Sequence, residues 1–561
     1  MVSPLSSPYP RPVPLIGDAS AAAERAADPA AWAFPGPARE AFYDVVGARR
    51  DIRRFRPDPV PPETLERVLA AAHAAPSVGH SQPWRFLVVR DAARRDAAAL
   101  MAEREKLAQA DLMDEESGRQ LRDLSLEGIR AAPLGVVVCC DRRTPATGVL
   151  GRATFPDADL WSCACAIQNL WLAARAEGLG LGWVTLFRPE ELAALLGLPD
   201  GVVTLGWLCL GWPDERPPEP GLQRRGWSRR APLSEVVFTD SWPGSAPPPP
   251  PSRLAAPDQR AVVTARDSGD DLLTVPTSLG VLDTVLDRIL AVRPEGAAGG
   301  TLVLAAAAHP VTRHGVSAYP PSVTGDVLAA AREGTSQSAT AARAAGLDLH
   351  AVDTGTGDGD LLTRDALTPA SAAALVERGR ATGLGLAPAG LVALGEVGIG
   401  NTTPAAALAA ALLGLPAADT VGLGAGADSA MLDRKREVVE AALARLDGRA
   451  DPLAVCGGPE FAFLAGVVLG TAEAGGIVVL DGLATSVAAL AAVRRSPGVV
   501  AHLVAGQRSR ERAHGLVLRE LGLEPLLDLR LRAGEGVGAC LAAGLILDGL
   551  RMRRETARTS A

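Results

Sequence analysis

Hydrophobic and polar positions before residue 240 follow two different periods. The segment 62–76, PETLERVLAAAHAAP, has apolar residues every three or four positions and predicts a helix. Short apolar runs predict strands at 85–91 (RFLVVRD), 134–141 (LGVVVCCD) and 202–211 (VVTLGWLCLG). Such mixing of helices and strands indicates an α/β or α+β fold.

The second half of the chain has short apolar runs separated by alanine-rich helical segments. The runs lie at 301–308 (TLVLAAAA), 420–424 (TVGLG) and 476–482 (GIVVLDG). Strand, crossover helix and strand in this order predict a parallel sheet with both faces covered. Ligands of such sheets bind beyond the carboxyl ends of the strands, where glycine turns lead into helices.

A run of five prolines at 247–251 divides the chain, because such a run joins neither a helix nor a central strand. The predicted fold class is α/β overall: an α+β domain joined by a Pro-rich linker to an α/β domain with a Rossmann-like parallel sheet and a small helical subdomain. The predicted boundaries are a flexible arm at 1–35, a first domain at 36–242, a linker at 243–264, a second domain at 265–552 and a tail at 553–561.

The composition and the sequence pattern argue against several classes of function. The 561 residues carry a net charge of −8 and only 4% aromatic residues, which argues against nucleic-acid binding. The most apolar stretch, 463–482, contains a glutamate and glycines and predicts helix, turn and strand, so we expect no membrane span. The first 20 residues lack a signal-peptide pattern and the seven cysteines form no CxxC pair, so we expect a reducing cytoplasm. No carboxylate or cysteine lies close in sequence to His309 and His314, so we expect no metal.

The first half gathers groups that suit a phosphorylated ligand with a ring. Five arginines lie at 49, 50, 53, 54 and 56. Arginine forks bind a terminal phosphate, although a solvated charged face is the ordinary alternative for a basic cluster. The segment PSVGHSQPW adds the hydrogen-bonding groups of Ser77 and Gln82 and the flat surface of Trp84. No GxGxxG motif follows a strand, so a Rossmann dinucleotide fits poorly.

The segments RRDIRRFRPDPVP, APSVGHSQPWRF, AIQNLWLAARAEGLGLGWVTLF and GWSRRAPL resemble the nitroreductase-fold flavoproteins, and among them the 5,6-dimethylbenzimidazole synthase family. The resemblance covers about 40–242. It implies that reduced FMN is a substrate, which dioxygen fragments to 5,6-dimethylbenzimidazole, the lower ligand of cobalamin, and a four-carbon sugar phosphate. NAD(P)H would act only indirectly, by reducing the flavin.

The same resemblance implies roles for individual residues. Asp51 would take a proton during cleavage of the ribityl chain, although pairing with the arginines is the alternative. Thr185 stands where the family usually has serine, and its added methyl group restricts the side chain near the flavin. The implied flavin-binding residues are Arg49, Arg50, Arg53, Ser77, Gln82, Gly182, Trp183 and Arg230.

In the second half, glycines or small residues open three apolar helices. These are GEVGIGNTTPAAALAAALLG (395–414), CGGPEFAFLAG (456–466) and DGLATSVAAL (481–490). The free amides of such helices make anion pockets, and three of them favour a phosphorylated ligand. With GVSAYPPSVT and LRAGEGVGACLA, these segments resemble nicotinate-nucleotide:dimethylbenzimidazole phosphoribosyltransferases over about 265–552. That family transfers phosphoribose from nicotinate mononucleotide to dimethylbenzimidazole, giving α-ribazole 5′-phosphate and nicotinate.

Glu535 lies between two glycines just before an apolar run and matches the catalytic glutamate of this family. A carboxylate in an apolar slot can accept the benzimidazole proton, whereas a helix-capping acid is the alternative. Glu396 matches a second glutamate of this family and would assist Glu535 or orient the nucleotide. Lys435 would bind phosphate, with a helix-surface lysine as its alternative. The implied substrate-binding residues are Ser317, Tyr319, Gly398, Gly400, Asn401, Thr402, Lys435, Gly457, Gly458, Asp481 and Gly482.

Four departures weaken the second resemblance: VPTSLG at 275–280, Ala308 in place of aspartate, Pro310 in place of glycine and Leu423 where arginine is common. The leading hypothesis is a bifunctional enzyme of cobalamin lower-ligand assembly, whose first half makes the base that the second half consumes. The alternative is an ordinary FMN-dependent nitroreductase fused to a degenerate base-binding module. Both families form homodimers, so we expect a homodimer.

Overall fold

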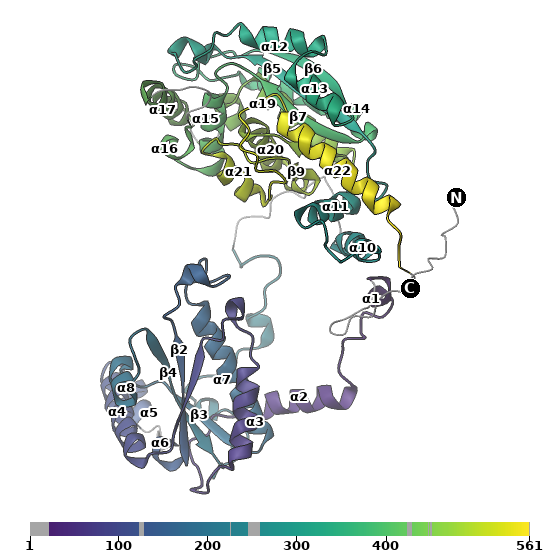
Figure 1. The fold of residues 1–561 in the computed structure, drawn as a ribbon. Helices are drawn as coiled ribbons and strands as arrows, with labels where there is room; N and C mark the ends of the chain where they lie inside the picture. Colours follow the sequence, from purple (N-terminus) through teal and green to yellow (C-terminus); the bar gives the residue numbers. More distant parts are fainter. Residues whose placement is uncertain are drawn as a thin grey trace. The chain divides into compact units, whose positions relative to one another are not determined.

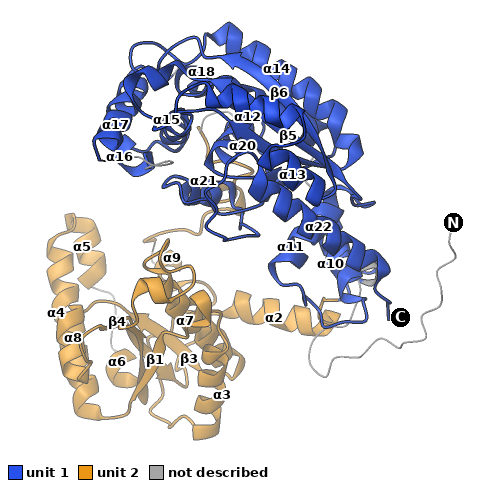
Figure 2. Cartoon of the chain, turned by 45° about the horizontal axis from the view of Figure 1, so that its top comes forward, with its two compact units in different colours: residues 1–31, 249–561 blue, residues 32–248 orange. Residues whose placement is uncertain are grey.

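The chain forms two compact units in the computed structural model, residues 32–248 and residues 1–31 with 249–561. We call them the N-terminal unit and the C-terminal unit (Figure 2). The structure describes residues 22–122, 128–224, 226–244, 259–422, 429–446, 448 and 451–559. Each unit has its own sheet.

The N-terminal unit is built on a four-stranded antiparallel sheet in the order β1-β2-β4-β3. Its strands are β1 (Trp84–Val89), β2 (Leu134–Asp141), β3 (Gly180–Val184) and β4 (Val202–Gly211). Its α-helices are α2 (Gly36–Ala48), α3 (Pro62–His73), α4 (Ala92–Asp111), α5 (Glu115–Arg122), α6 (Gly128–Ala131), α7 (Ala158–Ala176), α8 (Pro189–Leu196) and α9 (Gly221–Arg224). Short 3-10 helices lie at η1 (Val78–His80), η2 (Ala146–Gly148) and η3 (Leu233–Glu235).

Alternate side chains of β2 enter two different cores, as the period of a strand requires. Val136 and Val138 pack with α3 and α7, whereas Val137 and Cys139 pack with α4 on the other face. The sheet is therefore covered on both faces by helices.

The C-terminal unit is built on a five-stranded parallel sheet in the order β6-β5-β7-β8-β9. Its strands are β5 (Gly300–Ala308), β6 (Leu347–Thr356), β7 (Leu391–Val397), β8 (Ile477–Leu480) and β9 (Leu503–Ala505). Val392 and Leu394 face one core, and Leu391 and Ala393 face the other. Burial on both faces explains why β5, β7, β8 and β9 are largely apolar, whereas the edge strand β6 is partly exposed and carries polar residues such as Asp348 and His350.

The C-terminal unit has helices on both faces of this sheet and further helices beyond them (Figure 1). They are α1 (Ala22–Ala27), α10 (Gln259–Asp270), α11 (Val281–Val292), α12 (Val323–Arg332), α13 (Gln337–Ala344), α14 (Pro369–Leu386), α15 (Thr402–Leu413), α16 (Ala417–Thr420), α17 (Ser429–Ala444), α18 (Pro452–Cys456), α19 (Pro459–Glu473), α20 (Leu483–Arg495), α21 (His514–Leu521) and α22 (Val537–Glu555). The 3-10 helices are η4 (Pro310–His314), η5 (Ala387–Ala389) and η6 (Pro497–His502). The core with α11, α13 and α22 lies on one face, and α15, α19 and α20 line the other.

The structure confirms the mixed fold and most predicted elements, and it corrects others. The helix, turn and strand predicted within 463–482 are α19 and β8. The strand predicted at 420–424 is wrong at Thr420, which ends α16, and 423–424 lie outside the described residues. Strands β3, β6, β7 and β9 were not predicted.

Several elements fall inside ranges that the sequence assigned to connecting segments. Helix α1 lies within the arm predicted at 1–35, and Arg25 forms an ion pair with Asp267 at 3.1 Å. Helix α10 begins inside the linker predicted at 243–264, and α22 extends into the tail predicted at 553–561. Among the described residues, no helix is both long enough and apolar enough to span a bilayer.

Candidate active sites

Four acidic residues meet beyond the carboxyl ends of the parallel strands in the C-terminal unit. Glu396 is the sixth residue of β7, and Asp481 directly follows β8. Glu460 lies in the first turn of α19, and Glu535 lies in the loop before α22. The charges of Glu460, Asp481 and Glu535 all act on Glu396, which places the four acids in one cluster. The parallel sheet brings them together because its strand ends share an edge.

Glu535 is held close to β7 by its backbone. Its amide N–H donates to the carbonyl of Glu396 at 3.1 Å. Its φ of +63° is in the left-handed region, which is uncommon outside glycine. Its Oε2 is buried and has no hydrogen-bond partner among the residues that the structure describes. A strained backbone and an unsatisfied carboxylate oxygen in one residue are typical of a functional site.

The sequence suggests that the glycines on either side of Glu535 let a flat ring approach the backbone, but the structure gives Gly536 a different purpose. A Cβ at Gly536 would lie 2.6 Å from Leu302 and 2.9 Å from the Cα of Gly395. A Cβ at Gly395 would lie 2.7 Å from the carbonyl of Glu535. Gly536 and Gly395 are thus required because the loop packs directly on β7. Only Gly534 leaves open space, with the Oε1 of Glu396 at 3.6 Å from its Cβ position.

Glu396 is surrounded by acids, and its Oε2 accepts a hydrogen bond from the amide of Asn401. Burial raises the pKa of Glu396 to about 8, and the negative charge of Glu460 adds to this rise. Glu396 therefore keeps its proton to a higher pH than a carboxyl group in water does.

Asp481 holds the loop that carries Glu535. Its Oδ2 accepts from the amide of Gly536 at 3.2 Å, and its Oδ1 accepts from the amide of Ala539 at 3.2 Å and from Gln507 at 2.9 Å. Burial raises its pKa to about 6, although these donors oppose the rise. Its contacts are those of a helix anchor, whereas the sequence suggested substrate binding.

The sequence did not predict Glu460, which is fully buried and bonds through Oε1 to the Nε2 of His309 at 2.8 Å. Its position directly after a glycine-opened helix start, in CGGPEF, was the available signal. His314 likewise bonds to Asp360 at 3.1 Å. Both histidines thus have carboxylate partners that are distant in sequence, and no group of three metal-ligand residues occurs within the described ranges.

The predicted nucleotide residues surround this cluster. Gly398, Gly400 and Asn401 form the turn between β7 and α15, and the φ of Gly400 is +89°. The other glycine turns precede α19 (Gly457 and Gly458) and α20 (Gly482).

Lys435 and the predicted base-binding residues differ in burial. Lys435 is buried, and its Nζ donates to the hydroxyl of Thr402 at 3.1 Å. The helix-surface alternative for Lys435 is therefore wrong, and burial lowers its pKa. Ser317 accepts from the amide of Tyr319 at 3.2 Å, and Tyr319 is exposed.

In the N-terminal unit, Asp51 and Arg53 form a polar group at the edge of the sheet. The residue Asp51 pairs with Leu181 of β3, and its Oδ1 accepts from the amide of Trp183 at 3.1 Å. Its Oδ2 lies 2.5 Å from Arg53, whose Nη2 also donates to the carbonyl of Trp183 at 3.0 Å. Although 38% of the Asp51 side chain is exposed, the surrounding protein atoms partly desolvate its carboxylate. This desolvation raises the pKa of Asp51, and the positive charge of Arg53 opposes the rise.

The other arginines of this site differ in how their charge is used. Arg49 stacks over Trp171 at 4.6 Å, and its pKa is lowered by burial and by the charges of Arg230 and Arg50. Arg50 donates to the backbone carbonyls of residues 47, 49 and 218. The positive charges of Arg49 and Arg230 thus suit a bound anion. Arg50 instead holds the backbone segments whose carbonyls it contacts.

The remaining predicted flavin residues lie on the segment 77–82 and on β3. The hydroxyl of Ser77 accepts from the amide of Gln82 at 3.1 Å. A Cβ at Gly182 would lie 2.2 Å from the carbonyl of Ile52, so the strand and the arginine segment require glycine there. Thr185 is exposed just after β3.

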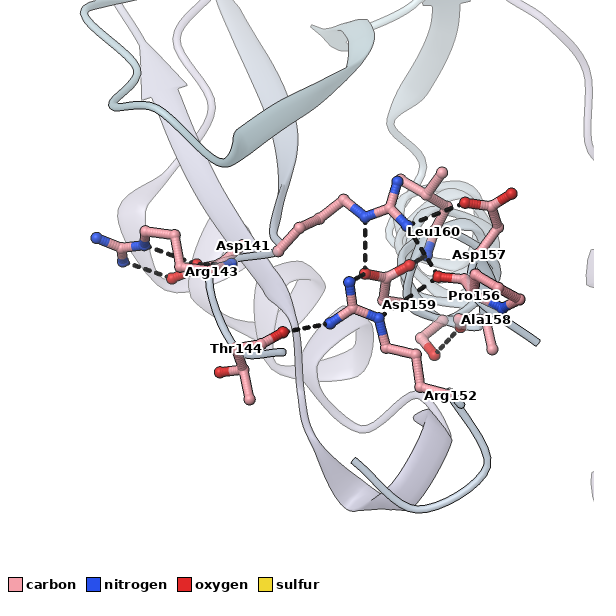
Figure 3. A network of polar contacts seen from close by, with 11 residues as sticks. Asp141, Arg143, Thr144, Arg152, Pro156, Asp157, Ala158, Asp159 and Leu160 are labelled. Atoms are coloured by element: carbon pink, nitrogen blue, oxygen red, sulfur yellow. Dashed lines mark hydrogen bonds and ion pairs between the residues drawn. The ribbon is translucent and has the colours of Figure 1, made fainter. Parts of the chain in front are cut away.

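A buried ion-pair network holds the loop 142–157 (Figure 3). Asp159, at the start of α7, is 1% exposed and pairs with Arg152 at 2.8 Å and with Arg142 at 3.0 Å. Part of this loop contacts the segment 77–82, because a Cβ at Gly79 would lie 2.9 Å from the backbone of Leu150. The network therefore supports the segment that carries Ser77 and Gln82.

Comparisons with known proteins agree with this division. Residues 254–561 match the family model described as phosphoribosyltransferase, and residues 46–212 match the nitroreductase family. A 5,6-dimethylbenzimidazole synthase of Rhodospirillum rubrum is 47% identical over 184 residues, 33% of this chain and 87% of that protein. A nicotinate-nucleotide–dimethylbenzimidazole phosphoribosyltransferase of Thermus thermophilus is 40% identical over 321 residues, 53% of this chain and 96% of that protein. A crystal structure of such a transferase from Thermus thermophilus gives a TM-score of 0.50 at 37% identity, over 54% of this chain and 97% of that one.

Proposed function

The chain belongs to the nicotinate-nucleotide–dimethylbenzimidazole phosphoribosyltransferases through its second half and to the 5,6-dimethylbenzimidazole synthases through its first, and from this premise we propose that its two sites act in succession. It is a bifunctional enzyme of cobalamin lower-ligand assembly. The N-terminal unit forms dimethylbenzimidazole from FMN, and the C-terminal unit transfers phosphoribose to it from nicotinate mononucleotide. The observation that carries the proposal is that the named product of one relative is the named substrate of the other.

In the N-terminal unit, reduced FMN and dioxygen are the substrates that we propose. Arg49 and Arg230 suit the flavin phosphate because their positive charges lie close enough to act on each other. Asp51 is placed to accept a proton during fragmentation of the ribityl chain, and Arg53 orients it. NAD(P)H supplies electrons indirectly, through prior reduction of the flavin.

In the C-terminal unit, Glu535 removes the proton of the benzimidazole while the other ring nitrogen attacks the anomeric carbon of the nucleotide. The C–N bond to nicotinate breaks as the new C–N bond forms. The buried, unpartnered Oε2 of Glu535 supports this role. The turn 398–402 and Lys435 suit the phosphate, because backbone amides and a cation meet there.

A homodimer is the assembly that we propose for the N-terminal unit. Large apolar side chains are exposed on α2 and in the segment 233–242, among them Phe42 (56%), Tyr43 (69%), Phe238 (44%) and Trp242 (73%). Two exposed aromatic pairs, Phe42 with Tyr43 and Phe238 with Trp242, favour burial against a partner. One chain has a mass of 57.8 kDa, and sedimentation of the intact chain at micromolar concentration should give twice this mass. A sedimenting monomer would contradict the dimer.

The test of the whole function supplies reduced FMN, air and nicotinate mononucleotide to the purified chain. We expect loss of flavin and the appearance of α-ribazole 5′-phosphate by mass spectrometry. Return of intact, reoxidised flavin would instead indicate an ordinary nitroreductase. The 47% identity to a dimethylbenzimidazole synthase does not favour that alternative.

A further inference from the structure

The segment 77–82, which carries Ser77 and Gln82, has a backbone conformation that its own residues do not favour. The φ angles of Gly79, His80 and Gln82 are +54°, +52° and +46°. Left-handed backbone outside glycine persists where the surrounding structure holds it in place, and it occurs often at ligand sites. The segment therefore needs support from outside, and the elements that supply this support also fix Ser77 and Gln82.

Two neighbouring elements of the N-terminal unit supply this support. The hydroxyl of Ser162, near the start of α7, accepts from the amide of Val78 at 3.1 Å. The loop 142–157 lies against Gly79, because a Cβ there would lie 2.9 Å from the backbone of Leu150. The position of the loop thus helps to determine the position of the segment that carries the predicted flavin residues.

One buried carboxylate holds both ends of this loop (Figure 3). Asp159 is 1% exposed, and its Oδ2 pairs with the Nη2 of Arg152 at 2.8 Å and with the Nε of Arg142 at 3.0 Å. Arg152 also donates to the carbonyl of Thr144, and Arg142 to the carbonyl of Pro156, at 2.8 Å in each case. The start of the loop and its end are therefore tied to the same acid.

The contacts of this network are local. Within the described part of the chain, the side chains of Asp159, Arg142 and Arg152 form hydrogen bonds and ion pairs only with residues between 142 and 160. Buried ion pairs roughly repay the cost of removing their charges from water, so they add little net stability. The network is thus better suited to fixing one loop than to stabilising the whole unit.

We propose that Asp159 is a positioning residue of the flavin site. It fixes the loop 142–157 against Gly79 and thereby holds Ser77 and Gln82 in the conformation that receives the flavin. This inference rests on the proposed binding of FMN to the N-terminal unit. Because Asp159 acts through the loop, its loss should weaken the binding of FMN and change the fragmentation step little.

The affinity of the intact chain for FMN, measured by quenching of flavin fluorescence, tests this role. Asp159→Asn keeps the shape of the side chain and removes its charge, so the two arginines are left to repel each other and the loop moves. FMN should then bind about 10-fold more weakly, whereas the single-turnover rate of fragmentation at saturating reduced FMN should change less than about threefold. Arg142→Met, which keeps the pair of Asp159 and Arg152, should weaken binding about threefold and replaces the first variant if that one does not fold.

Glu105→Gln is the matched control in the same unit. The Oε1 of Glu105 also pairs with two arginines, Arg104 and Arg188, at 2.9 Å in each case. Glu105 belongs to α4, which covers the face of the sheet opposite α7. Its loss should leave the affinity for FMN unchanged. Equal affinities of Asp159→Asn and Glu105→Gln would overturn the inference.

A double-mutant cycle separates positioning from a general loss of stability. Gly79→Ala should also weaken FMN binding, because its Cβ would push the segment away from Leu150 while the ion pairs stay intact. Since both changes disturb the same contact, Gly79→Ala combined with Asp159→Asn should lose less binding free energy than the two single variants together. Fully additive losses would mean that Asp159 does not act through this contact, and would also overturn the inference.

The outcomes distinguish the proposed function from the positioning role. If the unsubstituted chain binds no FMN, the proposed flavin site fails. If it binds FMN and fragments it, and Asp159→Asn has the affinity of the unsubstituted chain, only the positioning role fails.

Discussion

The two proposed sites are built from side chains of opposite charge. The site of the N-terminal unit is a group of arginines at a sheet edge, with Asp51 38% exposed and Tyr43 and Trp242 of the same unit exposed as well. The site of the C-terminal unit is a cluster of acids, of which Glu460 and Asp481 are buried. In our proposal the first site holds phosphate with arginines, whereas the second holds it with backbone turns and Lys435 and reserves its acids for proton transfer.

Sheet topology explains much of this difference. A parallel sheet places all its strand ends and the following glycine turns at one edge, so one chain encloses the site. In the antiparallel sheet the strand ends alternate, and the site is assembled by adding the segment at Asp51 beside Leu181 of β3. We therefore expect the acidic site to be complete within one chain and the arginine site to need a second copy.

The largest expected effect comes from Glu535→Gln. Loss of the base should lower kcat for α-ribazole phosphate formation about 10³-fold, while flavin fragmentation by the same sample stays unchanged. The transfer rate is measured with added dimethylbenzimidazole by chromatography. Glu524→Gln, an exposed acid before the same loop, should leave both rates unchanged. Normal transfer by Glu535→Gln would mean that another group takes the proton.

Removal of one cation should have a smaller but clear effect on the open site. Arg49→Met keeps apolar contact with Trp171 and removes the charge, so FMN should bind about 30-fold more weakly, equivalent to ~2 kcal/mol. Quenching of flavin fluorescence measures this affinity. Arg54→Met is the control, since its side chain is 66% exposed and lies 4.0 Å from Asp214. Equal losses in both variants would indicate general charge attraction rather than a defined phosphate site.

The close packing of the acidic site can be disturbed without a change of charge. Gly395→Ala should push the Glu535 loop away from β7, because the new Cβ would lie 2.7 Å from the Glu535 carbonyl. A misplaced base should lower kcat about 10-fold. Gly325→Ala in α12, which has nothing within 4 Å, should not change kcat. If Gly395→Ala has the same kcat as the unsubstituted chain, the loop position is not rate-determining.

Sequence reasoning reached further in some parts of these sites than in others. Strands β2 and β4 were predictable because their apolar runs are long, whereas β3 was missed because two glycines in GLGWV interrupt its apolar pattern. Glycine is required at position 182 because the carbonyl of Ile52 leaves no room for a Cβ. Long-range packing, not local propensity, determined that strand.

The same limit applies to the candidate residues. Glu535 was recognisable from its flanking glycines, but the partner of His309 lies 151 residues away and only the fold brings Glu460 to it. The anchoring contacts of Asp481 also depend on a loop 55 residues further along the chain. Local patterns thus indicated which residues belong to the site, and tertiary structure separated those that support the base from the base itself.

The smallest expected effect concerns Thr185, where the resembling family usually has serine. Thr185 is exposed in the N-terminal unit, and its methyl carbon lies 3.3 Å from the Cβ position of Gly206. Thr185→Ser keeps the hydroxyl group and frees its rotation, so the rate of flavin fragmentation should change by less than about threefold. The decay of FMN absorbance in a single turnover measures this rate. A change of tenfold or more would show that the methyl group acts on the flavin itself, and that this open site is as closely fitted as the enclosed one.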